Sequence, residues 1–236
     1  NEDETGEFEM VATAVPGQTA SAAAYASHSS AGYQPNVDVA PGSVSSPQLF
    51  IPPAGLLGID GEAWLAAAST SSTWGGCQVW VSADGTSYEM VGTITKAARY
   101  GTLSAALASH ADPDNTNTLA VDLTASHSTL TSATAAEMNA GATLALVDNE
   151  LVAYQTATLT SAYHFSLAPL RRALYGTAAA AHSSGARFVR LDDAIFKFGY
   201  KSLNVGNTIY VKLPSFNIYG RALEDIATCT EYTIEL

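Results

Sequence analysis

The stretch Gln78-Val-Trp-Val-Ser-Ala-Asp-Gly-Thr-Ser-Tyr-Glu-Met-Val91 decides the fold class, because two strand-like runs in it flank a tight turn. Residues 78–81 and 88–91 are rich in aromatic and β-branched side chains, which favour strands. Asp84-Gly85 lies between them and supplies the positive φ that a hairpin turn needs. This stretch therefore predicts a β-hairpin.

Short runs of the same kind recur along the chain. Residues 143–147 and 150–154 are separated by Asp148-Asn149, two residues that tolerate a left-handed backbone, so we expect a second hairpin there. Residues 96–110 are rich in alanine, and their periodicity does not separate helix from strand. Further strands are predicted at 49–51, 63–65, 163–167, 187–191, 208–212 and 232–235.

One short helix is predicted near residues 135–140. Thr134 and Glu137 have the spacing of a capping box, and Gly141 is placed to end the helix after less than two turns. The expected fold class is therefore all-β with minor α, built from antiparallel β-sandwich or barrel domains. We expect an extended segment and connector from a preceding domain at 1–47, a sandwich-like domain at 48–115 plus 191–236, and an inserted barrel-like domain at 116–190.

Composition limits the classes of function. With 47% hydrophobic and only 14% charged residues among 236, the chain can bury a genuine core and has the profile of a tightly assembled protein. A net charge of −12 argues against nucleic-acid binding, which needs clustered Lys and Arg. The apolar runs are much shorter than the roughly 20 residues that cross a bilayer, so no membrane span is expected. Because the chain starts with Asn1, we expect a processed chain or a piece of a longer one.

The best metal candidate is the oxygen-rich stretch Asp112-Pro-Asp114-Asn115-Thr-Asn117, which has calcium-like spacing. It lacks the glycine at the sixth position and the bidentate glutamate at the twelfth that a calcium-binding loop of the EF-hand type uses. An ordinary loop is therefore the favoured interpretation, and no metal or other cofactor is assigned.

Reactive side chains do not form a recognisable motif. The histidines at 28, 110, 127, 164 and 182 never stand three or four residues apart, so no zinc pair fits one helix face, and each is expected at the surface or in a strand. A disulfide between Cys77 and Cys229 is one interpretation, but two isolated thiols in the core are favoured. Neither Gly-x-Ser-x-Gly nor a phosphate-binding glycine motif occurs, so no catalytic residue is assigned.

Two further sets of side chains have both a binding and a structural interpretation. Trp64, Trp74 and Trp80, with the eleven tyrosines, have the chemistry of a sugar-binding platform, but filling or rimming a core is favoured. Arg171-Arg172 is expected to hold a tight loop through guanidinium contacts to carbonyls or carboxylates.

Several motifs follow one another in a characteristic order. They are Trp74-Gly-Gly-Cys-Gln-Val-Trp80 with Asp84-Gly85, Tyr88 and Val91-Gly92; Met138-Asn-Ala-Gly141, Val147-Asp-Asn-Glu150 and Ala153-Tyr154; Leu170-Arg-Arg-Ala-Leu-Tyr-Gly176-Thr177, His182 and Gly185-Ala-Arg187-Phe188; and Ile209-Tyr210-Val-Lys212 with Ser215-Phe-Asn-Ile-Tyr-Gly220. In that order they resemble the C-terminal half of the large hub proteins of long-tailed phages and gene transfer agents, which are related to the tip-attachment or host-specificity protein.

The resemblance covers about residues 48–236 and is most specific from Val147 to Phe188. It implies a non-enzymatic virion protein at the distal end of the tail, assembled as a homotrimeric ring, and a chain that is a fragment of a longer hub. The implied partners are the tail tube or distal tail protein, the tip fibres and a cell-surface receptor. The acidic balance would suit a conduit for DNA, because a negative wall repels phosphate.

Two other classes of function compete with the structural hub. A receptor- or glycan-binding module of a tail tip or cell surface is the first alternative, suggested by the Tyr, Trp, Asn and Ser content. A glycan or peptidoglycan hydrolase is the second, and it requires acid, base and nucleophile to converge in a pocket.

Overall fold

The computed structural model describes residues 36–57, 61–200 and 206–236, of which Val37–Leu236 belong to one compact unit. Most of the predicted N-terminal segment at 1–47 lies outside the described residues. The strands are β1 (Gln48–Phe50), β2 (Glu62–Ala66), β3 (Trp74–Ser82), β4 (Glu89–Ile94), β5 (Tyr100–Leu103), β6 (Leu119–Asp122), β7 (Leu144–Val147), β8 (Glu150–Ser161), β9 (His164–Arg171), β10 (Arg187–Arg190), β11 (Phe196–Gly199), β12 (Thr208–Lys212), β13 (Ser215–Asn217) and β14 (Glu231–Glu235). The helical elements are α1 (Ala135–Asn139) and the single 3₁₀ turns η1 (Ala54–Leu56) and η2 (Leu174–Gly176).

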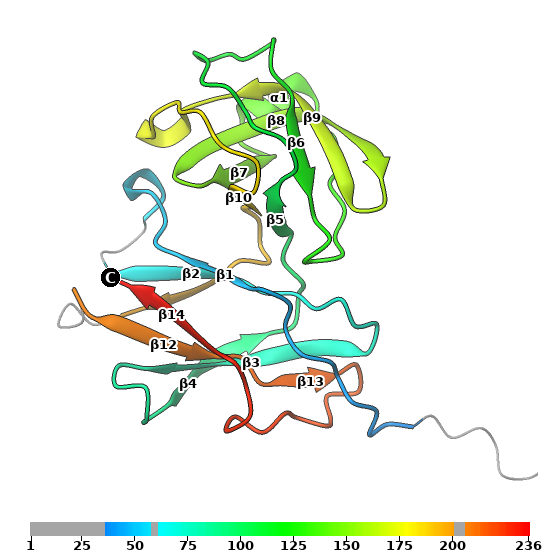
Figure 1. The fold of residues 1–236 in the computed structure, drawn as a ribbon, viewed down its shortest axis with the longest axis vertical. Helices are drawn as coiled ribbons and strands as arrows, with labels where there is room; N and C mark the ends of the chain where they lie inside the picture. The colour runs from blue at the N-terminus through cyan, green and yellow to red at the C-terminus, as the bar shows by residue number, and fades with distance from the viewer. Residues whose placement is uncertain (1–35, 58–60, 201–205) are drawn as a thin grey trace, which may run out of the picture. The chain divides into compact units, whose positions relative to one another are not determined.

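Six of the strands close into an antiparallel barrel in the order β10-β5-β6-β9-β8-β7 (Figure 1). The second predicted hairpin is confirmed as β7–β8, with Asp148 at the turn in the left-handed region at φ 48°. β5 shows that part of the alanine-rich stretch 96–110 is a strand. Because β5 belongs to the barrel, the barrel begins before the predicted boundary at residue 116, while the division into two domains stays a prediction.

The remaining strands form two antiparallel sheets. One has the order β1-β2-β11, and the other has the order β13-β3-β12-β14 with β4 also paired to β3. The first predicted hairpin is confirmed as β3–β4, whose register places Val81 opposite Glu89. In its turn, Oδ1 of Asp84 accepts hydrogen bonds from the backbone N–H groups of Thr86 and Ser87, and Gly85 has φ +71°.

Three apolar clusters hold these layers together. The first fills the barrel and contains Leu119, Val121 and Phe188, among others. The second joins the outer face of barrel strands to the three-stranded sheet through Tyr100 and Trp64. The third fills the space between the two sheets, which makes them a β-sandwich. The all-β prediction of sandwich and barrel with one short helix is therefore confirmed.

The predicted helix is α1, and its capping box is present. The backbone N–H of Glu137 donates to Oγ1 of Thr134 at 3.2 Å, and the backbone N–H of Thr134 donates to Oε2 of Glu137 at 2.7 Å. Gly141 follows at φ +80°, in the left-handed region that ends a helix. No helix among the described residues has the length and hydrophobicity to cross a membrane.

Candidate functional site

Arg172 lies at the centre of a buried charged network at one end of the barrel, directly after β9. Its side chain is 0% exposed, yet each of its five N–H groups has an acceptor. Nε and Nη2 donate to Oε1 and Oε2 of Glu150 at 2.7 and 2.9 Å, and Nη1 donates to Oδ2 of Asp114 at 3.0 Å. The two remaining N–H groups donate to the carbonyls of Ala108 and Ala180. The expectation that the Arg pair holds a loop through such contacts is confirmed for Arg172, because its acceptors lie in three separate segments: the β5–β6 connection, β8 and the segment before β10.

Glu150 is the first residue of β8 and directly precedes the apolar run at residues 151–154. Its Oε1 also accepts the backbone N–H of Ala173, and its Oε2 also accepts the backbone N–H of Ala180, both at 3.0 Å. Burial by itself would raise the pKa of Glu150, but the hydrogen bonds from Arg172, His182 and these two backbone groups outweigh it and lower the pKa. Glu150 is therefore held as a carboxylate inside the protein.

The oxygen-rich loop predicted as the best metal candidate contributes to this network. Asp114 is 0% exposed, and its two oxygens accept hydrogen bonds from the backbone N–H groups of Thr116 and Asn117, from Nδ2 of Asn117 and from Arg172. Together these bonds lower the pKa of Asp114 against the effect of burial. The carboxylate of Asp114 therefore binds hydrogen-bond donors of the protein itself, from its own loop and from Arg172.

Asp112 in the same loop binds the other arginine of the pair. Its Oδ1 and Oδ2 accept from Nε and Nη2 of Arg171, each at 2.8 Å, and the hydrogen bonds from Arg171 lower the pKa of Asp112. Asn115 is exposed. Within residues 36–57, 61–200 and 206–236, no group of three or more His, Cys, Asp or Glu is arranged to hold a metal ion.

His182 is one of the members of the network that sequence reasoning missed, together with Asp148 and Glu150. Of the two positions predicted for His182, the surface is wrong, because its side chain is 3% exposed, whereas its backbone forms an antiparallel bridge with Leu107. Its Nδ1 lies 2.9 Å from Oδ2 of Asp148, and its Nε2 lies 2.9 Å from Oε2 of Glu150. Its backbone N–H and C=O pair with those of Leu107, both at 2.8 Å. Three carboxylates, one guanidinium and one imidazole thus converge from segments distant in sequence.

Of the other described histidines, His110 lies next to Asp114 of the network, and the other two have separate surroundings. His127 stacks on Tyr163 with ring centroids 4.4 Å apart. His164 lies 3.5 Å from Asp122, and His110 lies 3.7 Å from Oδ1 of Asp114. His28 lies outside the described residues. Besides the Arg pair and the Asp112–Asn117 loop, the sequence held one further signal for the network: Glu150 is a charged residue in a predicted strand that is otherwise apolar.

The comparison with protein families bears on the part of the chain that carries this network. Residues 98–189 match a family model described as Rcc01698-like, C-terminal. This range begins just before β5 and ends in β10, so the matched segment is the closed barrel with its buried network. No match to the chain was found among the curated proteins.

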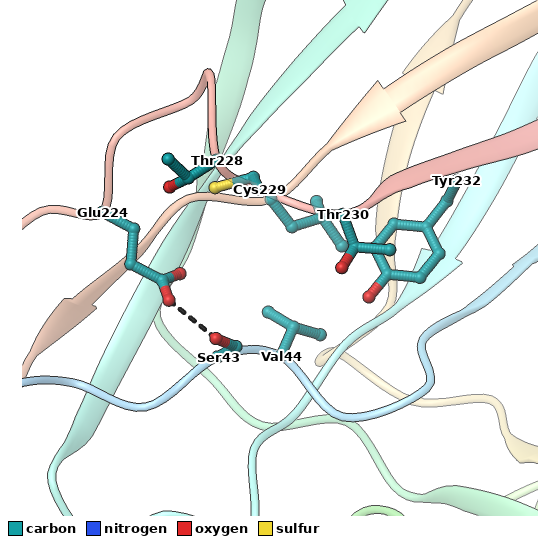
Figure 2. A pocket seen from close by; sticks show the side chains of 8 residues that line it. Ser43, Val44, Glu224, Thr228, Cys229, Thr230 and Tyr232 are labelled. Atoms are coloured by element: carbon teal, nitrogen blue, oxygen red, sulfur yellow. Dashed lines mark hydrogen bonds between the residues drawn. The ribbon is translucent and has the colours of Figure 1, made fainter.

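A small pocket lies outside the barrel, between the segment at Ser43 and the loop before β14 (Figure 2). Its volume is about 70 Å³, well below the roughly 300–1,000 Å³ of a ligand site. Glu224 in its wall accepts hydrogen bonds from Oγ of Ser43 at 2.7 Å and from the backbone N–H of Ser215 at 2.8 Å. Glu224 therefore links the segment at Ser43 to the start of β13 by hydrogen bonds.

The two cysteines are both free thiols. Cys77 is fully buried, and burial raises its pKa to about 12. Cys229 is only half-buried, so the expectation of two core thiols holds for Cys77 alone. Burial raises the pKa of Cys229 as well. Both thiols are therefore protonated at neutral pH and are weak nucleophiles.

A larger hollow of about 440 Å³ borders the β3–β4 turn and is lined by Asp84, Glu89 and Tyr200, among others. The carboxylate of Asp84 is hydrogen-bonded within the turn, because its Oδ1 also accepts a hydrogen bond from Oγ of Ser82 at 2.8 Å. The hydrogen bonds from Ser87, Thr86 and Ser82 lower the pKa of Asp84. Asp84 is therefore a turn-forming carboxylate.

The tryptophans mostly serve the core, as the sequence favoured. Trp64 is 4% exposed, and Trp74 is half-buried against the sandwich core. Trp80 is half-buried too, but it follows Val79, which is 0% exposed and belongs to the sandwich core. Because neighbouring residues of a strand point to opposite faces, Trp80 lies on the outer face of the sheet.

Proposed function

We propose that this chain is a structural component of the tail hub or baseplate of a phage or phage-like particle. In this proposal it assembles as a homotrimeric ring at the distal tail tip, binds the neighbouring tail proteins and supports host attachment and DNA passage. The observation that carries the proposal is the match of the barrel to the Rcc01698-like model, a family name associated with gene transfer agents.

The buried network supports a structural role over a catalytic one. All five N–H groups of Arg172 and both oxygens of Glu150 are used within the barrel. A catalytic acid or base has to reach a substrate atom within hydrogen-bond distance. Glu150 and Asp114 are at most 1% exposed and already hydrogen-bonded, so the network fits the role of fixing the barrel end.

A rigid loop with an apolar surface supports the assembly part of the proposal. In the loop after β13, Ile218, Tyr219 and Leu223 are 55%, 45% and 51% exposed. Exposed apolar side chains close together are typical of protein interfaces. This set, Ile218, Tyr219 and Leu223, is called the apolar loop below.

Asn217 makes the apolar loop rigid before any partner binds. Asn217 is 0% exposed, and its Oδ1 accepts the backbone N–H groups of Tyr219 and Arg221 at 2.9 and 3.0 Å. Its Nδ2 donates to the carbonyls of Val37 and Val39 at 2.8 and 2.7 Å. A preorganised loop loses little conformational entropy on binding, which favours its use in an interface.

Sedimentation velocity over a concentration series tests the ring. We expect the chain to form trimers, and we expect the double substitution Ile218→Asp with Leu223→Asp to shift the equilibrium toward monomer. Leu159→Asp is the matched control, because Leu159 is 61% exposed on the barrel and outside the apolar loop. A wild-type chain that stays monomeric at all concentrations would contradict self-assembly of this part.

Cryo-electron microscopy of the particle tests the location. The barrel and sandwich should fit density at the distal end of the tail. Density elsewhere in the particle, or none in the tail, would contradict the proposal.

A receptor- or glycan-binding module is the second candidate, and Trp80 is the observation that favours it. Trp80 lies opposite Met90 in the β3–β4 register, and Met90 is 47% exposed. The indole N–H of Trp80 donates to Oε1 of Gln78 at 2.9 Å, which fixes the ring on the outer face. Glycan-array binding that is lost in Trp80→Ala and kept in Leu159→Ala would support this candidate.

A further inference from the structure

Strand β4 forms a free edge of the five-stranded sheet (Figure 1). In the part of the chain that the structure describes, β4 pairs with β3 and with no other strand. The backbone N–H of Gln78 in β3 donates to the carbonyl of Pro214, which lies on the side of β3 away from β4. Thr93 lies opposite Gln78 in the antiparallel pair, so Thr93 turns its own N–H and C=O away from β3. These two groups therefore point to the free edge and have no partner in the ladder.

The β4 edge is less protected than the other outer strands of the sandwich. β1 and β13 have three residues each, β11 has four with Lys197 among them, and β14 begins and ends on a glutamate. β4 has six residues, and its single charged residue is Glu89 at the start. Met90 and Val91 are 47% and 42% exposed, and a bulge in the register leaves Val91 unpaired. An exposed strand edge with few charges is a template for pairing with another chain.

Two hollows lie on the inner side of this edge, between β4 and β11. The first, of about 440 Å³, is lined by Val91 and Tyr200 among others, and the second, of about 150 Å³, is lined by Ile94 and Phe196 among others. At Gly92 the two strands are in contact, because an added Cβ would lie 2.6 Å from the Phe196 ring. A strand added to β4 would direct every second side chain to this inner side, where the hollows offer room for apolar groups.

Glu89 gives one end of the edge an unbalanced negative charge. It is exposed, it lines the first hollow together with Asp84, and neither carboxylate forms an ion pair with a Lys or Arg of the described residues. At the other end of β4, Lys96 is paired with Asp193. Opposite charges on neighbouring strands attract each other, whereas like charges repel. An incoming strand is therefore favoured when it carries a Lys or Arg at the Glu89 end.

We infer that the free edge of β4 is a docking site for one extended strand of a different protein, with apolar side chains at alternate positions and a Lys or Arg near Glu89. This strand continues the five-stranded sheet, pairs with the backbone of Thr93 and fills the two hollows with its apolar side chains. The site lies on the opposite side of β3 from β13, and so away from the apolar loop. It does not depend on the ring that the apolar loop is proposed to form.

NMR titration of the whole chain with a synthetic peptide tests the site. The probe alternates threonine and valine between two terminal lysines. We expect the amide signals of β4 to shift, and hydrogen exchange at the amide of Thr93 to slow by about ten-fold at saturation, because this N–H gains an acceptor. The same peptide with glutamates in place of the lysines should bind about two- to five-fold more weakly. No shift in β4 at millimolar concentrations of the lysine peptide would overturn the inference.

Thr93→Pro blocks the edge while taking no hydrogen bond from the β3–β4 ladder, because the N–H that it removes points outward. Proline is tolerated at such positions of an edge strand. Thr93→Val is the matched control, since it keeps the N–H. We expect the lysine peptide to bind about ten-fold more weakly to Thr93→Pro and equally well to Thr93→Val. Equal affinities for the two variants would contradict pairing at this edge.

A charge exchange tests the same site without a change in the backbone. In Glu89→Lys the preference should reverse, so that the glutamate peptide binds about two- to five-fold more tightly than the lysine peptide. An unchanged preference would contradict the role of Glu89. Slow exchange at Thr93 in the chain alone, increasing with protein concentration, would identify a second copy as the occupant and would also overturn the inference. These readouts are local to β4, so they are independent of the sedimentation experiment on the apolar loop.

Discussion

Replacing Arg172 with methionine is the sharpest test of what holds the barrel end together. Met keeps the volume of the apolar stem but leaves Glu150 and Asp114 buried without their guanidinium. Removing one partner of a buried ion pair costs about 3–5 kcal/mol, and two carbonyls lose their donors as well. We therefore expect the free energy of unfolding to fall by at least about 4 kcal/mol, which is a large part of the roughly 5–15 kcal/mol of a typical domain.

Arg171→Met is the matched control for this experiment. Arg171 pairs with Asp112 through two side chains that are each 29% exposed, and partly exposed pairs contribute at most about 1 kcal/mol. Urea unfolding of both variants, followed by tryptophan fluorescence and circular dichroism, gives the two free energies. If both substitutions lowered the free energy of unfolding equally, within about 0.5 kcal/mol, the claim that Arg172 holds the barrel end together would be refuted.

The pH dependence of the same variants provides an independent check. The pKa values of Glu150 and Asp114 are lowered in the folded protein, so their contribution to stability is present above the unfolded values of about 4 and is lost as the pH falls through the folded values. Without Arg172 the two carboxyl groups lose their main ionic partner. The fall of stability in acid should therefore be shallower in Arg172→Met than in wild type, and an equally steep fall would contradict the argument.

Three smaller predictions follow from local geometry. Gly101→Ala should cost about 3 kcal/mol in urea unfolding, because an added Cβ would lie 1.9 Å from the carbonyl oxygen of Asp122, and a loss below about 0.5 kcal/mol would show that the two strands separate easily. Thr134→Ala should lower the free energy of unfolding by about 1 kcal/mol, because it removes the capping oxygen of α1, whereas Thr134→Ser keeps that oxygen and should keep most of the stability. Cys77, with its pKa raised to about 12, should resist a maleimide at pH 7.5 in the native protein and react after unfolding, as mass spectrometry would show; labelling as fast as that of Cys229 would contradict its burial.

Part of the candidate site is predictable from the sequence. Arg171 and Arg172 are expected to hold a loop because a guanidinium with five donors has to find several acceptors when the chain around it is compact. The loop at Asp112 and Asp114 stands out for its oxygens, but the sequence does not reveal their partner. Oxygen ligands suit a calcium ion and a guanidinium equally well, and only the tertiary structure shows that Arg172 lies beside Asp114 at the end of the barrel.

By itself the sequence determined the local structure: the alternation that makes Gln78–Val81 a strand, the Asp84-Gly85 turn, and the capping box at Thr134. These features depend on atoms a few residues apart, so the pattern of residue types is enough to specify them. Only the tertiary structure decided which strands close the barrel and that His182 meets Glu150, because an alternating strand presents the same backbone hydrogen bonds to any partner. The choice among partners is made by the packing of whole layers, which brings Glu150 and Asp114, 22 and 58 positions away in the sequence, into contact with Arg172.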